Sequence, residues 1–140
     1  MAEGLMRARI ETAGLQDAIT VRSAGIAAYA GSPASKDTRD LLDAHGIDFA
    51  DFRSTPVSTF LLDEVDYILC LSQMHRDAIL AHHPEYREKA LLVGEFLNSD
   101  DAPDIADPYG LGSAAYKQVE TELLQAIDNI LTLVQQDIEV

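Results

Sequence analysis

The feature that most constrains the fold is a short apolar run at residues 66–71, which reads Asp-Tyr-Ile-Leu-Cys-Leu. Its length suits a strand, and its apolar side chains are consecutive rather than alternate, which is typical of a strand buried on both faces of a parallel sheet. A helix is predicted directly after it, over about 73–82, and the apolar run 90–93 predicts another strand. Strands that alternate with helices at these lengths predict an α/β domain with a parallel sheet.

The rest of the chain supplies further helices and one more strand. Amphipathic or capped patterns predict helices over about 1–13, 35–44, from 58 or 59 to 64, and 113–136. Ser35 is a good N-cap for the second of these helices. The last of these carries an inward apolar stripe, formed by Tyr116, Val119, Leu123, Ile127, Ile130 and Leu131. The β-branched segment 19–25 predicts a strand that ends in a turn. The first element of an α/β fold is usually a central strand of the sheet, whereas the first element predicted for this chain is a helix.

Length and charge exclude several classes of protein. At 140 residues we expect a single domain, spanning 1–140. Ten basic against 24 acidic side chains give a net charge of −14, which disfavours nucleic acid and anionic membranes as partners. The sequence shows neither a membrane-span-length apolar run nor a secretory signal, and its single cysteine fits a reducing compartment. We therefore expect a cytoplasmic protein.

The loop 104–110 holds the residue with the clearest chemical potential. Pro108 pushes Asp107 toward an extended conformation, so the backbone partly sets the direction of this carboxylate. Gly110 permits a tight turn directly after the ring of Tyr109. A carboxylate held stiffly beside a ring can serve as a general acid or base. An Asx-Pro turn that leads into a helix explains the same residues, and spacing alone favours that interpretation.

Five short motifs carry a family resemblance, weak one by one and specific together. They are Met1-Ala2-Glu3-Gly4-Leu5, Arg22-Ser23-Ala24-Gly25, His45-Gly46-Ile47, Asp66-Tyr67-Ile68-Leu69-Cys70 and Asp107-Pro108-Tyr109-Gly110. In order and spacing they resemble the low-molecular-weight protein tyrosine phosphatase family, over essentially the whole chain. The resemblance implies a flavodoxin-like three-layer sandwich with four parallel strands. It also implies a Cys-x5-Arg active-site loop between the first strand and the first helix.

The sequence departs from the family pattern at that loop. In the family, the loop comes immediately before the residues that match Met1-Ala2-Glu3. We therefore expect this chain to lack the first, central strand, the nucleophilic cysteine and the phosphate-binding arginine, and to be inactive as given. By resemblance, Asp107 is the general acid, Tyr109 forms part of the substrate-binding wall, and Ser23 is a supporting hydroxyl. No cofactor is implied.

Two alternatives remain open. Residues 70–76 formally fit Cys-x5-Arg and lead from a strand into a helix, which would make Cys70 a nucleophile and Arg76 a phosphate clamp. No glycine lies between Cys70 and Arg76, however, although a phosphate-binding loop needs the close backbone approach that glycine permits. A free cysteine in an apolar strand is also most often a small buried hydrophobe. The other alternative is a non-catalytic relic that binds a partner or self-associates through unpaired sheet edges.

The sequence says less about the substrate and about a metal site than about the fold. The resemblance implies a phosphorylated protein or a small phosphate ester as substrate. The stretch 107–113 has one aromatic residue after Asp-Pro and is more similar to the bacterial branch that includes protein arginine phosphatases. His75, His82 and His83 do not have the spacing of metal ligands, and we expect no metal site.

Overall fold

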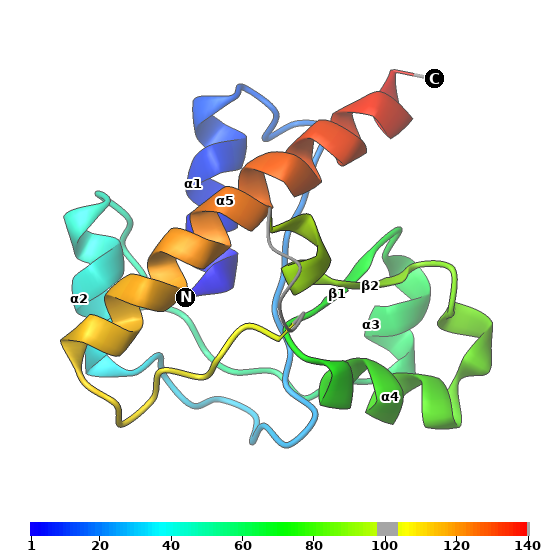
Figure 1. The fold of residues 1–140 in the computed structure, drawn as a ribbon, viewed down its shortest axis with the longest axis horizontal. Coiled ribbons are helices and arrows are strands. Elements are labelled where there is room, and N and C mark those ends of the chain that lie inside the picture. Colours follow the sequence, from blue (N-terminus) through cyan, green and yellow to red (C-terminus); the bar gives the residue numbers. More distant parts are fainter. Residues whose placement is uncertain (98–103, 140) are drawn as a thin grey trace.

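The computed structural model describes residues 1–97 and 104–139 (Figure 1). Within these residues the elements follow the order α1 (Ala2–Thr12), α2 (Lys36–Ala44), α3 (Thr59–Glu64), β1 (Ile68–Cys70), α4 (Gln73–His82), η1 (Pro84–Tyr86), β2 (Ala90–Leu92), η2 (Val93–Phe96) and α5 (Ser113–Ile138). The predicted helices and the two later strands are confirmed, with ends that shift by no more than two residues. In the part of the chain described, no helix is both long and apolar enough to cross a membrane.

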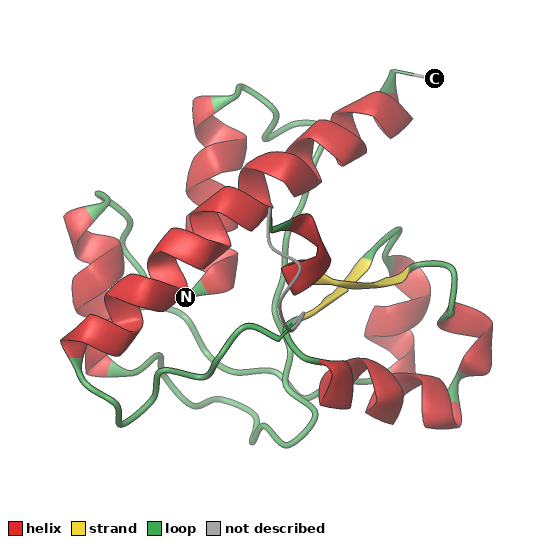
Figure 2. Ribbon diagram, viewed as in Figure 1, coloured by secondary structure: helices red, strands yellow, loops and turns green. Residues whose placement is uncertain are grey.

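The two strands lie side by side in parallel, as Figure 2 shows. Their register pairs Ile68 with Ala90, Leu69 with Leu91 and Cys70 with Leu92. Helix α4 and the short η1 form the connection between them. This crossover is the βαβ unit that parallel pairing requires, and it confirms the predicted α/β class.

The predicted strand at 19–25 is wrong. The structure assigns no strand there and leaves one isolated parallel bridge, between Gly25 and Pro56. β-branched residues favour a strand only where a neighbouring strand pairs with their backbone, and the sheet of the described residues contains β1 and β2 alone. Ile19 and Val21 instead pack, partly buried, against the larger core.

The sheet separates two groups of buried side chains. The large cluster joins α1, α2 and α5 and comprises Leu5, Met6, Ile10, Leu42, Phe49, Val93, Ile105, Val119, Leu123, Ala126, Ile127, Ile130 and Leu131. The small cluster lies under α3 and α4 and comprises Leu62, Ile68, Cys70, Ile79, Leu80, Tyr86, Ala90 and Leu92. Side chains alternate along β1, so Cys70 enters the small cluster while Leu69 and Leu71 pack against the large one.

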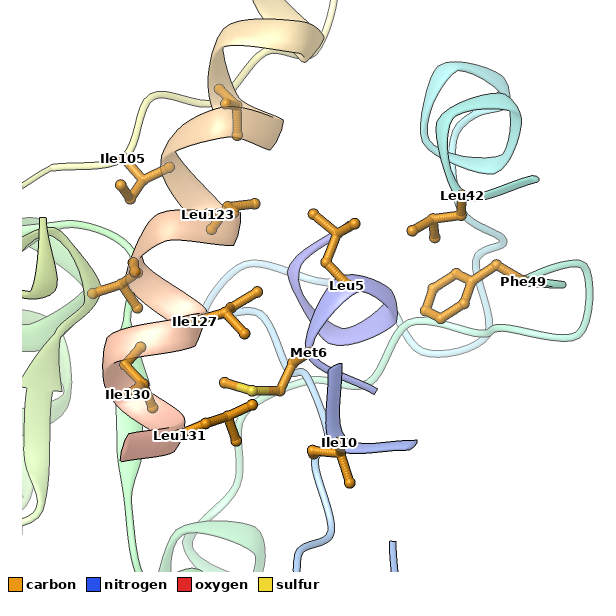
Figure 3. Packing of buried hydrophobic residues seen from close by; sticks show 13 residues of the cluster. Leu5, Met6, Ile10, Leu42, Phe49, Ile105, Leu123, Ile127, Ile130 and Leu131 are labelled. Carbon is orange, nitrogen blue, oxygen red and sulfur yellow. The ribbon is translucent and has the colours of Figure 1, made fainter. Parts of the chain in front are cut away.

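Helix α5 organises the large cluster. All six residues of its predicted inward stripe are buried. Figure 3 shows the Met6 side chain directed toward Ile127 and Leu131, while Leu5 lies between the α5 row and Leu42. Full burial of an aliphatic side chain contributes roughly 1.5–3 kcal/mol. This packing therefore fixes α1 between α5 and α2.

Candidate active site

The loop before α5 is fastened to the end of β1 by two consecutive residues. The Ile105 backbone N–H donates to the carbonyl oxygen of Leu71 at 2.8 Å, and the Ile105 side chain is buried in the large cluster. The Gln73 backbone N–H donates to Asp104 Oδ1 at 2.7 Å. These bonds hold the loop at the carboxyl edge of the sheet, which is where open α/β folds place their sites.

Two residues further on, the chain makes the predicted Asx-Pro turn. The Tyr109 backbone N–H donates to Asp107 Oδ1 at 3.1 Å, and the Leu111 backbone N–H donates to the Pro108 oxygen at 3.0 Å. Gly110 has a φ of +77°, which the third position of a type II turn requires. The turn and the general-acid hypothesis are compatible, because the turn orients a carboxylate that remains exposed.

Asp107 and Tyr109 lie at a pocket of about 420 Å³. Its walls come from the amino-terminal halves of α1, α2 and α5, the residue that follows β1, the first turn of α4, and the loop 104–110, which we call the acid loop. The lining residues are Met1, Ala2, Ser35, Thr38, Leu71, His75, Ile105, Ala106, Asp107, Pro108, Tyr109, Tyr116, Val119 and Leu123. The Tyr109 side chain is 75 % exposed, as expected of a residue at the rim. The structure thus brings together the predicted acid and the predicted substrate wall.

Three hydroxyl groups form a polar patch in this pocket. Ser35 caps α2, as predicted, by accepting the Thr38 backbone N–H at 3.2 Å. Its Oγ also donates to Thr38 Oγ1 at 3.0 Å and lies 3.3 Å from the Tyr116 hydroxyl. No sequence pattern singles out Thr38 as a pocket residue, and the apolar stripe of 113–136 explains Tyr116 as a core residue alone. The capping position of Ser35 was the one available signal, because Tyr116 follows 81 residues later.

Ser23 lies elsewhere. Its backbone N–H and its hydroxyl both donate to Glu3 Oε1, at 2.8 and 3.0 Å, while Arg7 donates to Glu3 Oε2 at 2.6 Å. Glu3 is buried, so these donors satisfy a carboxylate that burial would otherwise destabilise. Ser23 therefore ties the 19–25 segment to α1, and it is not among the side chains that line the Asp107 pocket.

Cys70 has the environment of a packing residue. It is 3 % exposed in the small cluster, whereas its neighbour Leu71 lines the pocket. Burial raises the pKa of the Cys70 thiol, and this effect outweighs the opposing charge of Arg76. The Arg76 Nε–H donates to the carbonyl oxygen of Ala90 at 2.8 Å. A nucleophilic thiolate requires a lowered pKa and access, so the geometry argues against the Cys70/Arg76 alternative.

Comparisons with known proteins agree with this architecture. The family described as "Low molecular weight phosphotyrosine protein phosphatase" matches residues 1–140. A protein-arginine-phosphatase from Geobacillus stearothermophilus is 32 % identical over 112 residues, which cover 80 % of this chain and 74 % of the relative. The low molecular weight protein-tyrosine-phosphatase PtpA of Staphylococcus aureus (strain MRSA252) is 29 % identical over 138 residues, or 98 % of this chain and 86 % of PtpA.

Solved structures show the same fold. The YwlE arginine phosphatase from Geobacillus stearothermophilus superposes with a TM-score of 0.83 at 29 % identity, covering 97 % of this chain and 86 % of that one. A low molecular weight protein tyrosine phosphatase from T. tengcongensis also superposes with a TM-score of 0.83, at 30 % identity, covering 94 % and 87 %.

Proposed function

The chain belongs to the low molecular weight phosphotyrosine protein phosphatase family, and we propose that Asp107 is its general acid in the removal of phosphate from phosphorylated proteins. One observation carries this proposal. Asp107 is an exposed carboxylate, oriented by its own turn, at a pocket on the carboxyl edge of a parallel sheet. Such a placement suits a group that must meet a substrate and exchange a proton with it.

The reaction implied by the family has two steps. A cysteine thiolate attacks phosphorus, and the bond from phosphorus to the leaving atom breaks, which is oxygen in phosphotyrosine and nitrogen in phosphoarginine. The leaving atom takes the electron pair of that bond together with the proton of the Asp107 carboxylic acid. Water then attacks the cysteinyl phosphate and gives its proton to the Asp107 carboxylate. The sulfur–phosphorus bond breaks, the electron pair returns to sulfur, and inorganic phosphate leaves. Tyr109 would flank the substrate at the rim.

The nucleophile of these steps is not Cys70. It is the only cysteine of the 140 residues, and its thiol is buried with a raised pKa on the face of β1 opposite the pocket wall. We infer that residues 1–140 supply the general acid of the site but not a Cys-x5-Arg nucleophile loop. The 140-residue chain by itself should not hydrolyse p-nitrophenyl phosphate.

A fusion tests this proposal directly. A first strand and Cys-x5-Arg segment of the pattern that the family resemblance implies would be joined to Met1, and hydrolysis of p-nitrophenyl phosphate would be compared with that by residues 1–140 alone. We expect turnover only in the fusion, loss of turnover when the grafted cysteine becomes serine, and full turnover in Cys70→Ser. Turnover by residues 1–140 that Cys70→Ser abolishes would instead support the alternative nucleophile. A folded but inactive fusion would support a binding role without catalysis.

We also propose that the fused enzyme prefers phosphoarginine to phosphotyrosine. The support is a rim with one ring, Tyr109, followed directly by Gly110, and relatives that include protein-arginine-phosphatases. The kcat/KM of the fusion for phosphorylated arginine and tyrosine peptides of matched sequence measures the preference. A higher value for the phosphotyrosine peptide would refute it.

A further inference from the structure

We propose that Asp104 is a positioning residue for Asp107, fastening the acid loop to the first backbone N–H of α4. This inference rests on the proposed role of Asp107 as general acid. Asp104 Oδ1 lies 2.7 Å from the Gln73 nitrogen, in a contact between residues 31 positions apart in the chain. From sequence alone, Asp104 was only part of the loop that carries the acid.

Helix α4 does not need Asp104 in order to begin. Ser72 is its N-cap, and the Ser72 hydroxyl already accepts the His75 backbone N–H at 3.2 Å. Gln73 is the first helical residue, so its N–H has no partner within the helix and points outward. A carboxylate is also favoured there by the helix dipole. The segment that gains a fixed position is therefore the loop rather than the helix.

The bond forms one half of a two-point anchor. Ile105, next in the chain, is fixed by the Leu71 carbonyl oxygen and by burial of its side chain. Two consecutive anchors set both the position and the direction of the backbone as it enters Ala106. Asp107 follows one residue later, and Pro108 already restricts the backbone dihedral angles that Asp107 can adopt. A shift of about 1 Å in a catalytic group can cost roughly a hundredfold in rate, so this anchor matters for catalysis.

The two ends of the bond can be removed separately. Asp104→Ala removes the acceptor, and Gln73→Pro removes the donor. Proline is well accepted at the first helical position, and Ser72 before it is already extended, with φ −144° and ψ 160°. Gln73→Ala is the matched control. It keeps the backbone N–H and loses only the side-chain bond from Gln73 Nε2 to Asp77 Oδ1.

Amide hydrogen exchange in the 140-residue chain reports the anchor without any activity. In Asp104→Ala and in Gln73→Pro, we expect the Ile105 and Tyr109 amides to exchange about tenfold faster, as for loss of one hydrogen bond to a charged group. Gln73→Ala should match wild type. The double variant should exchange no faster than either single one, since both remove the same bond. Unchanged exchange in Asp104→Ala would overturn the proposal.

Kinetics of the fused enzyme separate positioning from a purely structural role. Phenyl phosphate has a more basic leaving group than p-nitrophenyl phosphate and depends more on proton donation. Asp104→Ala and Gln73→Pro should therefore lower kcat/KM more for phenyl phosphate, and Asp104→Asn, which keeps an acceptor oxygen, should recover most of the loss. Equal losses for both esters would overturn the positioning role. If Asp107→Asn also lowers kcat/KM equally for the two esters, the proposed general-acid role of Asp107 is refuted, independently of the exchange data.

Discussion

Helices α1 and α2 lie close together at Gly4 and Leu42, and this contact allows a stability prediction whose sign can be tested. A methyl group added at Gly4 would lie 2.7 Å from Leu42 Cδ1 and 2.9 Å from Leu42 Cδ2. Leu42 is 0 % exposed, so its side chain has little room in which to move away. The contact also bears on the site, because the amino-terminal ends of both helices line the Asp107 pocket.

The expected energies follow from two opposing effects. Alanine in place of a helical glycine stabilises by about 1 kcal/mol. Overpacking a filled core costs about 1–3 kcal/mol, so Gly4→Ala should be net destabilising by about 1 kcal/mol. Leu42→Ala alone should cost about 2–5 kcal/mol. In the Leu42→Ala background the obstruction is gone, and Gly4→Ala should then stabilise by about 1 kcal/mol or more.

Urea unfolding of wild type, Gly4→Ala, Leu42→Ala and the double variant measures whether the effect of Gly4→Ala on the free energy of unfolding changes sign. Leu41→Ala provides a matched background, because Leu41 is the neighbouring leucine and is not among the atoms nearest to a Gly4 methyl group. Gly4→Ala should remain destabilising there. If it stabilises the wild-type and Leu42→Ala backgrounds equally, the close approach of α1 and α2 at Leu42 is refuted.

Two further predictions concern titratable groups of the small cluster. The Cys70 thiol is buried and its pKa is raised. Iodoacetamide at pH 7.5 should therefore label it slowly in the folded chain and rapidly in urea. Fast labelling of the folded chain, if phosphate blocked it, would contradict this prediction. The hydrogen bond from Tyr86 to Asp63 raises the pKa of Tyr86 from 10.0 to about 12. Its stabilising effect is complete below pH 10 and is lost between pH 10 and 12, where the unfolded chain has released the proton and the folded one has not. Tyr86→Phe should therefore be less stable at pH 7 and should lack this alkaline loss in urea unfolding, and a loss of equal size in both proteins would refute the assignment.

Patterns within one or two helical turns predicted the structure well. The serine at position 35 caps its helix as expected, and the apolar stripe of α5 is buried along its predicted length. The apolar run at 66–71 contains β1, and its alternate side chains fill cores on both faces of the sheet. Each of these features depends on residues close together in the chain, where periodicity and capping chemistry apply directly.

Polar contacts between distant segments could not be predicted in this way. Asp104 and Gln73 are 31 positions apart, and Glu3 and Ser23 are 20 apart. Such bonds form only after packing has placed two elements together, so neither residue carries a local pattern that identifies its partner. The strand expected at 19–25 failed for a related reason, because strand formation depends on the neighbour that pairs with it.

The proposed mechanism depends above all on proton donation from Asp107 to the leaving group. Asp107→Asn keeps an oxygen that can accept the Tyr109 backbone N–H, so the turn should persist while the proton donor is lost. Asp77→Asn is a control with the same change of charge, at an exposed residue of α4. The direct measurement is kcat/KM for phenyl phosphate in the fused enzyme. We expect a fall of roughly 10²–10⁴-fold in Asp107→Asn and none in Asp77→Asn, and equal values for Asp107→Asn and wild type would refute the general-acid role of Asp107.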